Sequence, residues 1–237
     1  MPDIAFVADG FNLYHSVTDA SKDLTNQAYQ ALLATGSLGL MLPVGTRWLD
    51  MNSLFASYRA NIASGVAFKP GFHTQSVYYF SALAHHMERS SPGTVNRHLS
   101  YIQCLEATGV VPKLARFKSK FIRCDLCSGR LERHEEKETD VLVALQLIKL
   151  ALDQKNPVKA IALVSGDTDY APALRLVREM NPSVFLACLF PYKRKNRELA
   201  RLVDFSIDIP PAAYVAHQFA DPFTLQDGTQ IAKPANW

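Results

Sequence analysis

The sequence predicts an α/β fold with a mostly parallel central sheet and helices on both faces. Short apolar runs rich in β-forming residues alternate with longer segments of helical periodicity, and this alternation is typical of parallel strands joined by helices. One run, residues 160–164, is apolar at every position, as expected of a strand that is buried on both faces. The 237 residues are enough for one large domain or two small ones.

Turn residues and changes of period separate the elements in the first half of the chain. Residues 4–8 form a short apolar run that stops at Asp9-Gly10, as a buried strand ending in a turn would. Glycines and Pro43 interrupt residues 19–47, so we expect an irregular insertion there. The other predicted elements are a helix beginning at Leu13, a helix over 48–62, a strand over 76–80, a helix over 95–107 and a strand from Val110 toward Leu114.

The second half of the chain contains the clearest helix, over residues 140–154. It is apolar on nearly every face, so we expect it to be deeply buried. Residues 121–134 contain a cysteine pair and a glycine, which indicates a loop or a small hairpin. The remaining predicted elements are a strand over 160–164, a helix over 171–180, a strand over 184–190, a helix over 196–203 and a strand over 205–209. We expect one domain over 1–210 and a loosely held, proline-containing tail over 211–237.

Charge and composition exclude several classes of protein. The net charge is only +3, from 25 Lys and Arg against 22 Asp and Glu, so any nucleic-acid site must be a local basic patch. Residues 1–9 lack the basic region and the long apolar run of a signal peptide. No stretch reaches the roughly 18 apolar residues of a membrane span. We therefore expect a soluble cytoplasmic protein without a membrane partner.

Acidic residues follow two predicted strands, at the edge of the sheet where α/β proteins bind ligands. Asp9 follows the first strand, and Asp167 and Asp169 follow the strand that ends at Val164. If the segment between Asp167 and Asp169 is extended, both carboxylates point to the same side. Asp140 opens the clearest helix and can project toward the same edge.

Carboxylates gathered in one place repel each other, and desolvation strengthens the repulsion. Mg²⁺ or Mn²⁺ would resolve this conflict, because both prefer oxygen ligands. Two such ions can hold the attacking and the leaving oxygen of a phosphodiester. Each acid also has a structural interpretation, as a turn residue, a first-turn helix acid after Thr139 or a capping loop. Their joint position at two strand ends and one helix start favours a site.

Three motifs carry a resemblance to a known family: Asp9-Gly10-Phe11-Asn12, Glu135-Glu136-Lys137-Glu138-Thr139-Asp140 and Ser165-Gly166-Asp167-Thr168-Asp169-Tyr170. In combination they resemble the NYN family, LabA-like members of the PIN-like nuclease superfamily. Residues 196–209 resemble the closing helix and strand of that family. The resemblance covers most of residues 3–209 and leaves out residues 19–47 and the tail.

The resemblance implies a PIN-like sheet and Mg²⁺- or Mn²⁺-dependent ribonuclease chemistry, and we expect the RNA partner to be single-stranded. By position, it assigns catalysis and metal binding to four acids, which are Asp9, Asp140, Asp167 and Asp169. Asn12 matches the polar partner of these acids and would orient a water or a phosphate. Glu138 stands where a small residue is common, which leaves open whether it adds a ligand or faces solvent.

Two basic runs are candidates for contacts with an RNA backbone. The first follows a predicted strand end, on the same edge as the carboxylates, and we predict that it binds substrate: Lys193, Arg194, Lys195 and Arg197. The second could bind RNA or form a solvated face, and its members are Lys113, Arg116, Lys118, Lys120 and Arg123. Nearby rings could stack on single-stranded bases, namely Phe117, Phe121 and Tyr192.

Two of the four cysteines, Cys104 and Cys188, lie in apolar surroundings that predict burial. Cys124 and Cys127 have the spacing of half a tetrahedral zinc site. The other ligands would have to be histidines, from among His85, His86 and His134. A single Cys-x-x-Cys pair is weak evidence for Zn²⁺, so we expect a reduced pair and less than one zinc ion per chain.

Two other functions stay open at the level of sequence. One is an RNA-binding or scaffold module with an idle site, although every acidic position of the motifs is filled. The other is a phosphohydrolase of small phosphate esters, although haloacid-dehalogenase-type enzymes usually carry Asp-x-Asp where Gly10 and Phe11 follow Asp9. The sequence does not determine which RNA is bound, whether cleavage is internal or terminal, whether DNA is excluded, or whether homo-oligomers form.

Overall fold

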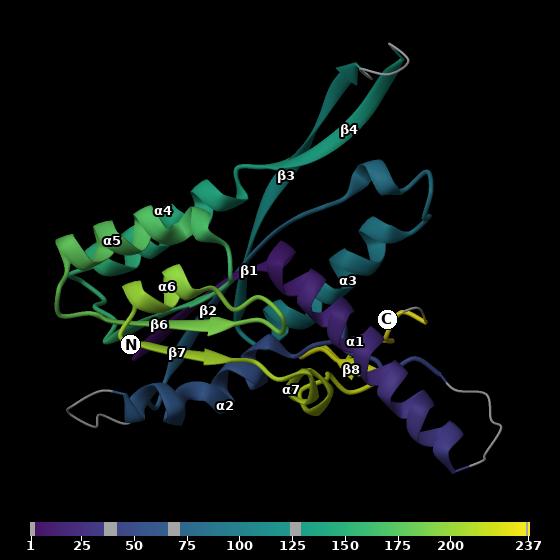
Figure 1. Ribbon diagram of the computed structural model, residues 1–237, viewed down its shortest axis with the longest axis horizontal. Coiled ribbons are helices and arrows are strands. Elements are labelled where there is room, and N and C mark those ends of the chain that lie inside the picture. Colours follow the sequence, from purple (N-terminus) through teal and green to yellow (C-terminus); the bar gives the residue numbers. More distant parts are fainter. Residues whose placement is uncertain (1–2, 36–41, 66–71, 124–128, 236) are drawn as a thin grey trace.

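A computed structural model describes residues 3–35, 42–65, 72–123, 129–235 and 237 of the chain. A seven-stranded sheet of order β4-β3-β2-β1-β5-β6-β7 forms its centre (Figure 1). Six strands run parallel, namely β1 (Ile4–Asp9), β2 (Gln75–Ala82), β3 (Val110–Arg123), β5 (Ala160–Val164), β6 (Phe185–Phe190) and β7 (Phe205–Asp208). The edge strand β4 (Arg130–Lys137) pairs antiparallel with β3. The predicted fold class, α/β with a mostly parallel sheet, is confirmed.

Helices cover both faces of this sheet (Figure 1). One face packs against α1 (Gly10–Ala34), α2 (Met51–Ser64), α3 (Thr94–Ala107) and α7 (Pro211–Ala216). The other face packs against α4 (Thr139–Leu152), α5 (Ala171–Met180) and α6 (Arg197–Leu202). Side chains of the central strand β1 alternate between the two cores, so that Phe6 enters one and Val7 the other. Burial on both faces is the reason that β1 is apolar without interruption up to Asp9.

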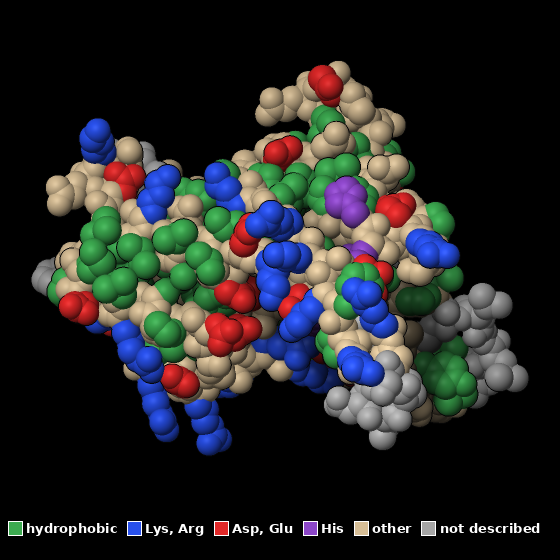
Figure 2. All heavy atoms as spheres, turned by 90° about the horizontal axis from the view of Figure 1, so that it is seen from above, with side chains coloured by type: hydrophobic (Ala, Val, Ile, Leu, Met, Phe, Trp, Pro, Cys, Tyr) green, Lys and Arg blue, Asp and Glu red, His purple; other side chains and the backbone are tan. Residues whose placement is uncertain are grey.

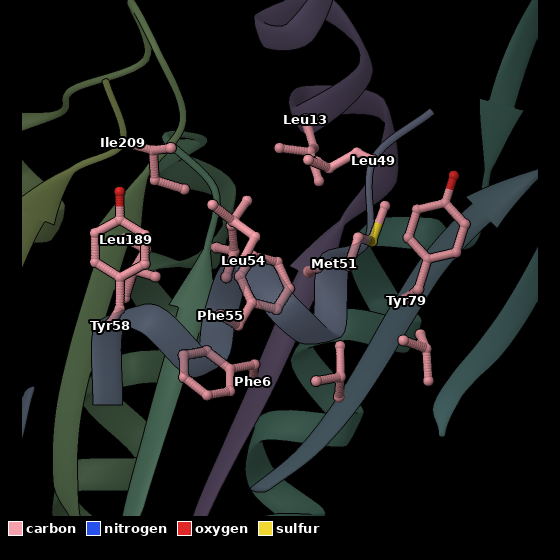
Figure 3. Packing of buried hydrophobic residues seen from close by; sticks show 14 of the residues in the cluster. Phe6, Leu13, Leu49, Met51, Leu54, Phe55, Tyr58, Tyr79, Leu189 and Ile209 are labelled. Carbon is pink, nitrogen blue, oxygen red and sulfur yellow. The ribbon is translucent and has the colours of Figure 1, made fainter. Parts of the chain in front are cut away.

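The larger core fixes α1 and α2 against the strand that carries Asp9. The rings of Phe6 in β1 and Phe55 in α2 stack with centroids 5.2 Å apart and planes 19° from parallel. Leu13 of α1 and Leu54 of α2 are fully buried in the same cluster (Figure 3). Burial of a leucine or phenylalanine side chain contributes about 1.5–3 kcal/mol, so this packing holds the end of β1 rigidly.

The expected irregular insertion over 19–47 is wrong in its first part, because α1 continues to Ala34. The last buried residue of α1 is Ala20, and the helix beyond it is largely exposed. No face of an exposed helix must be apolar, so this part of the sequence carries no clear helical periodicity. Residues 36–41 of the expected insertion lie outside the described part of the chain.

The strand expected from Val110 toward Leu114 is longer than predicted, and of the two alternatives for 121–134, a loop or a small hairpin, the antiparallel pairing of β3 with β4 agrees with the hairpin. Strand β3 runs to Arg123, and from Arg116 onward it pairs with β4. These residues form a two-stranded arm, the β3–β4 arm, that projects beyond the rest of the sheet (Figure 1). Both faces of the arm are rich in charge and largely exposed, which hides the apolar alternation by which strands are recognised. Cys124 and Cys127 lie outside the described residues.

Helix α4 is less buried than its composition predicts. Val143 and Leu147 are fully buried, whereas Val141 and Leu145 are 61% and 55% exposed. Apolar side chains gather over α4 and α5 on the surface of the molecule (Figure 2). A helix that is apolar all round looks the same in sequence whether one face or every face is covered, so only the packing decides this point.

The segment after Pro210 is packed, contrary to the expected loose tail. Tyr214 of α7 is fully buried, and its hydroxyl lies 2.8 Å from the hydroxyl of Ser16 in α1. A short hairpin of β8 (Phe223–Thr224) and β9 (Gln230–Ile231) follows. The ring of Trp237 lies 5.2 Å from that of Tyr101. Among the described residues, no helix combines the length and the hydropathy needed to cross a bilayer.

Candidate active site

A cleft of about 870 Å³ lies at the carboxyl ends of the parallel strands. Five carboxylates line it, and they come from four different parts of the fold. Asp9 ends β1, Glu135 and Glu136 belong to β4, Asp140 lies in the first turn of α4, and Asp167 follows β5. The fold therefore brings together three of the four acids that the sequence predicts, and it adds Glu135 and Glu136.

Asp9 is the most buried of these acids, with 4% of its surface exposed. One carboxylate oxygen, Oδ1, accepts the backbone N–H of Asn12 at 3.0 Å and so caps α1. The other, Oδ2, accepts the hydroxyls of Ser165 and Tyr170, each at 3.0 Å. These bonds fix the orientation of the carboxylate.

Tyr170 links two of the acids. Its hydroxyl oxygen lies 3.0 Å from Oδ2 of Asp9 and 2.9 Å from Oδ1 of Asp140. A phenol has one proton, so it can donate to only one of the two carboxylates at a time. Burial, together with the charges of Asp9 and Asp140, raises the pKa of Tyr170 far above that of an ordinary tyrosine. Tyr170 therefore stays neutral, and its one hydroxyl proton is shared between the carboxylates of Asp9 and Asp140.

The pKa values of two acids in the cleft also reflect an excess of negative charge. Burial raises the pKa of Asp9, and the charge of Asp140 adds to the rise. Burial likewise raises the pKa of Glu136, with further contributions from Asp9 and Asp140. Thr139 donates its hydroxyl to Glu136 and offsets part of this effect. Such a group of carboxylates favours a cation in the cleft.

Two glycines allow the strand ends to approach closely. A Cβ at Gly10 would lie 2.4 Å from the carbonyl oxygen of Phe80, and one at Gly166 would lie 1.8 Å from that of Arg194. The N–H of Gly166 donates to Oδ1 of Asn12 at 3.2 Å, which ties the loop after β5 to α1. Asn12 therefore has a structural contact besides its place in the lining of the cleft.

Asp167 and Asp169 do not point to one side, because the segment is not extended. Thr168–Tyr170 form a 3₁₀ turn, η2, and Asp167 caps it by accepting the N–H of Asp169 at 3.0 Å. Asp167 is half-buried and lines the cleft. Asp169 is exposed and, in the described part of the chain, lies outside that lining. The exposed Glu138 is likewise outside the lining and forms an ion pair with Arg116.

Comparison with known proteins places this geometry in a family. The family model of the NYN domain matches residues 48–210, more than half of the chain. The chain belongs to the NYN domain family. A search of curated proteins finds no match. A crystal structure of a protein of unknown function from Vibrio parahaemolyticus RIMD 2210633 is similar, with 17% identity and a TM-score of 0.45, over 88% of this chain and 93% of that chain.

NYN domains belong to the PIN-like nuclease superfamily, so nuclease activity is the family-level expectation. The matched region contains Asp140 and Asp167, but it begins after β1 and α1, which carry Asp9 and Asn12. Strand β1 lies between β2 and β5, both of which are in the matched region. The sheet therefore places Asp9, which precedes the matched region, in one cleft with Asp140 and Asp167.

The donor chemistry of this NYN site fits a hard divalent cation, since all five cleft acids offer carboxylate oxygens. Within the described residues, no three His, Cys, Asp or Glu side chains already stand at positions that would hold a metal ion. Asp9 is fixed by its hydrogen bonds. Glu135 is paired with Lys137 at 2.8 Å. Ligation would therefore need the other less buried acids to turn toward Asp9, and these are Glu136, Asp140 and Asp167.

The basic run after β6 is engaged in ion pairs within the NYN chain. Lys193 pairs with Asp23 at 2.6 Å, Arg194 with Asp19 at 2.8 Å, and Lys195 with Asp208 at 2.9 Å. Arg197 begins α6 and is exposed. In the described part of the chain, none of these four cations is among the residues that line the cleft.

Replacing Lys193, Arg194 and Lys195 together with glutamine should leave the salt dependence of RNA binding nearly unchanged. Each of the three cations is already paired with a carboxylate of the protein. We therefore expect them to make few contacts with RNA phosphates and to release few counterions from the RNA on binding. On single strands, each phosphate contact contributes about 0.7 to the slope of log affinity against log salt. Binding would be measured at several salt concentrations in Ca²⁺, to suppress cleavage. A flattening by about 2 units would instead assign the run to the RNA path.

Reasoning from sequence did not identify Glu136, Ser165 and Tyr170 as site residues. Ser165 and Tyr170 flank the predicted Asp167 and could have been noticed as hydroxyl donors beside an acidic cluster. Glu136 stands in the run Glu135-Glu136-Lys137-Glu138, in which any of the glutamates could face the cleft. Glu135 and Glu136 line the cleft, and only Glu136 pairs with the cleft residue Phe117 across the β3–β4 arm. No local signal reports that register.

Proposed function

We propose that this NYN domain is a metal-dependent ribonuclease that hydrolyses phosphodiester bonds in the cleft. The observation that carries the proposal is the convergence of carboxylates around the buried end of β1, where Asp9 and Asp140 share the single hydroxyl of Tyr170. Such a cluster is costly for a fold to maintain unless a cation neutralises it. Family membership supports phosphodiester chemistry as its use.

Asp9, Glu136, Asp140 and Asp167 would hold one or two Mg²⁺ or Mn²⁺ ions. A bound ion of this kind neutralises the charge that develops on a phosphate and activates water. Ser165 and Tyr170 would keep the carboxylate of Asp9 in place through their hydroxyls. Asn12 would hold the loop of Gly166 against α1, so that Asp9 and Asp167 keep a constant separation.

Incubation of the protein with a mixed RNA pool, with and without Mn²⁺, tests this function. We expect cleavage only with Mn²⁺ or Mg²⁺, and mapping of the new ends would distinguish internal from terminal cuts. A generic phosphate ester in a parallel reaction tests the alternative of a small-molecule phosphohydrolase. RNA binding without cleavage in either metal would contradict the proposal and favour a binding module with an idle site.

Asp167→Asn should reduce cleavage more than Asp169→Asn, although the two residues are neighbours in one motif. Asp167 lines the cleft and Asp169 is exposed outside it. Loss of a ligand should lower the rate at least about 100-fold, since metal coordination contributes several kcal/mol and each ~1.4 kcal/mol is tenfold. Single-turnover cleavage by both variants is the measurement. Equal losses would place Asp169 in the site with Asp167.

A further inference from the structure

Exposed rings stand beside the acidic site, at the start of α1. Phe11 is 52% exposed and Tyr14 is 50% exposed, and His15 is exposed as well. All three line the cleft that contains the carboxylates. They follow Asp9 within two turns of the same helix, whose opposite side enters the core through Leu13.

These rings form a connected group. The ring of Phe11 meets that of His15 edge to face, with centroids 4.5 Å apart and planes at 82°. Tyr14 meets His15 in the same manner at 5.6 Å and 73°. The guanidinium of Arg47 lies over the ring of Tyr14, 5.5 Å from its centroid. The rings meet edge to face, and one cation lies over Tyr14. These contacts therefore do not cover both faces of each ring.

An exposed aromatic residue alone has no special meaning, because many occur on protein surfaces. Tyr29, on the outer part of α1, is 47% exposed and is not among the described residues that line the cleft. Phe11 and Tyr14 differ from Tyr29 because they gather with each other and with a cation inside a cleft. Aromatic groups that gather in a concave site are typical of ligand contacts.

Other rings reach the same cleft from the side of the β3–β4 arm. Phe117 of β3 lies 4.6 Å from the ring of His86 in η1 (His85–Met87). His86 in turn stacks on His134 of β4, with planes 6° apart. Alternation along β4 places His134 on the same face as Glu136. Rings from α1 and from the arm thus line one cleft together with the acids.

We propose that Phe11 and Tyr14 stack on unpaired bases of a single-stranded RNA beside the acidic site. This inference rests on the proposed function, because it takes RNA as the ligand of the cleft. Stacking on side chains needs bases that are free of their neighbours, which a duplex does not offer. The cleft would therefore select single strands through ring contacts next to Asp9, without reading a particular sequence.

The experiment measures the affinity of a short, unstructured RNA oligonucleotide in Ca²⁺. Phe11→Ala and Tyr14→Ala should each weaken binding roughly tenfold, the order expected for one stacked base. Tyr14→Phe keeps the ring and should bind like the wild type. Tyr29→Ala is the matched control, an equally exposed ring on the same helix, and should also bind like the wild type. Circular dichroism would confirm that every variant is folded.

A second probe carries abasic sites in place of bases. The wild type should bind it about 100-fold more weakly than the intact RNA, the product of two roughly tenfold contacts, and the double variant Phe11→Ala/Tyr14→Ala should bind both RNAs alike. A duplex of the same sequence should bind more weakly than the single strand. The inference is overturned if Phe11→Ala and Tyr14→Ala bind like the wild type, or if the duplex binds equally well.

Cleavage by the wild type in Mn²⁺ separates this inference from the proposed function. Cleavage by the wild type together with unaltered RNA binding by the ring variants would contradict the stacking site and would still support the proposed nuclease activity. Ring-dependent binding of single strands without any cleavage would keep the stacking site and remove the nuclease activity. Absence of both binding and cleavage would overturn both proposals.

Discussion

Asp9→Asn should lower RNA cleavage at least about 100-fold, since metal coordination contributes several kcal/mol to catalysis and each ~1.4 kcal/mol is tenfold. Asp9 is the acid that the fold fixes most firmly, by one backbone and two hydroxyl donors. Asparagine has nearly the same shape and retains an oxygen that can cap α1. The variant should therefore fold normally and lose the negative charge on which the cation depends.

Without divalent ions, Asp9→Asn should be as stable as the wild type or more stable. Burial and the charge of Asp140 raise the pKa of Asp9, so its ionised form is disfavoured in the folded state. Removing that charge relieves the repulsion between the acids. Mn²⁺ should raise the melting temperature of the wild type, because a ligand that binds only the folded state stabilises it. The variant should show little or none of this rise.

Asp3→Asn is the matched control, because Asp3 lies just before the other end of β1. Its carboxylate pairs with Lys159, and the hydrogen bond from Lys159 holds the pKa of Asp3 well below the usual range of aspartate. The ionised form of Asp3 thus stabilises the fold, and its loss should lower the melting temperature without affecting cleavage. Full cleavage by Asp9→Asn would remove Asp9 from the site.

Gly166→Ala should destabilise the protein by about 1–3 kcal/mol, the usual cost of forcing extra atoms into a packed site. The added Cβ would stand 1.8 Å from the carbonyl oxygen of Arg194. A backbone atom cannot rotate away, so the loop after β6 or the loop after β5 must move. For a chain of this size, each kcal/mol corresponds to about 2–4 °C in melting temperature. Differential scanning calorimetry measures the shift.

The same substitution should also reduce cleavage, because Asp167 follows Gly166 directly and the N–H of Gly166 binds Asn12. Gly45→Ala is the matched control. A Cβ at Gly45 would first meet the flexible end of Lys233 at 3.5 Å, an ordinary contact. We expect the control to melt and cleave like the wild type. If Gly166→Ala melts at the wild-type temperature, the close approach of the two loops is not needed for the fold.

Local patterns in the sequence were sufficient for most of the fold. Apolar runs identified β1, β5 and β6 because these strands are buried on both faces, which imposes an apolar residue at every position. They missed the outer part of α1 and predicted the β3–β4 arm only in part, as a short strand from Val110 followed by a loop or a small hairpin. Those segments are largely exposed, and a solvated surface places little constraint on the pattern of apolar residues.

The candidate site was likewise predicted in part from the sequence and decided in part only by the tertiary structure. Sequence alone placed Asp9 and Asp167 at strand ends, because the carboxyl ends of parallel strands meet at one edge. Only the tertiary structure brought in Glu136 and Tyr170 and left Asp169 outside, since strand register and the 3₁₀ turn of η2 decide where these side chains point. Ion pairing of Lys193 with Asp23 depends on α1 extending past residue 20. Such contacts join residues far apart in the chain, and no local pattern encodes them.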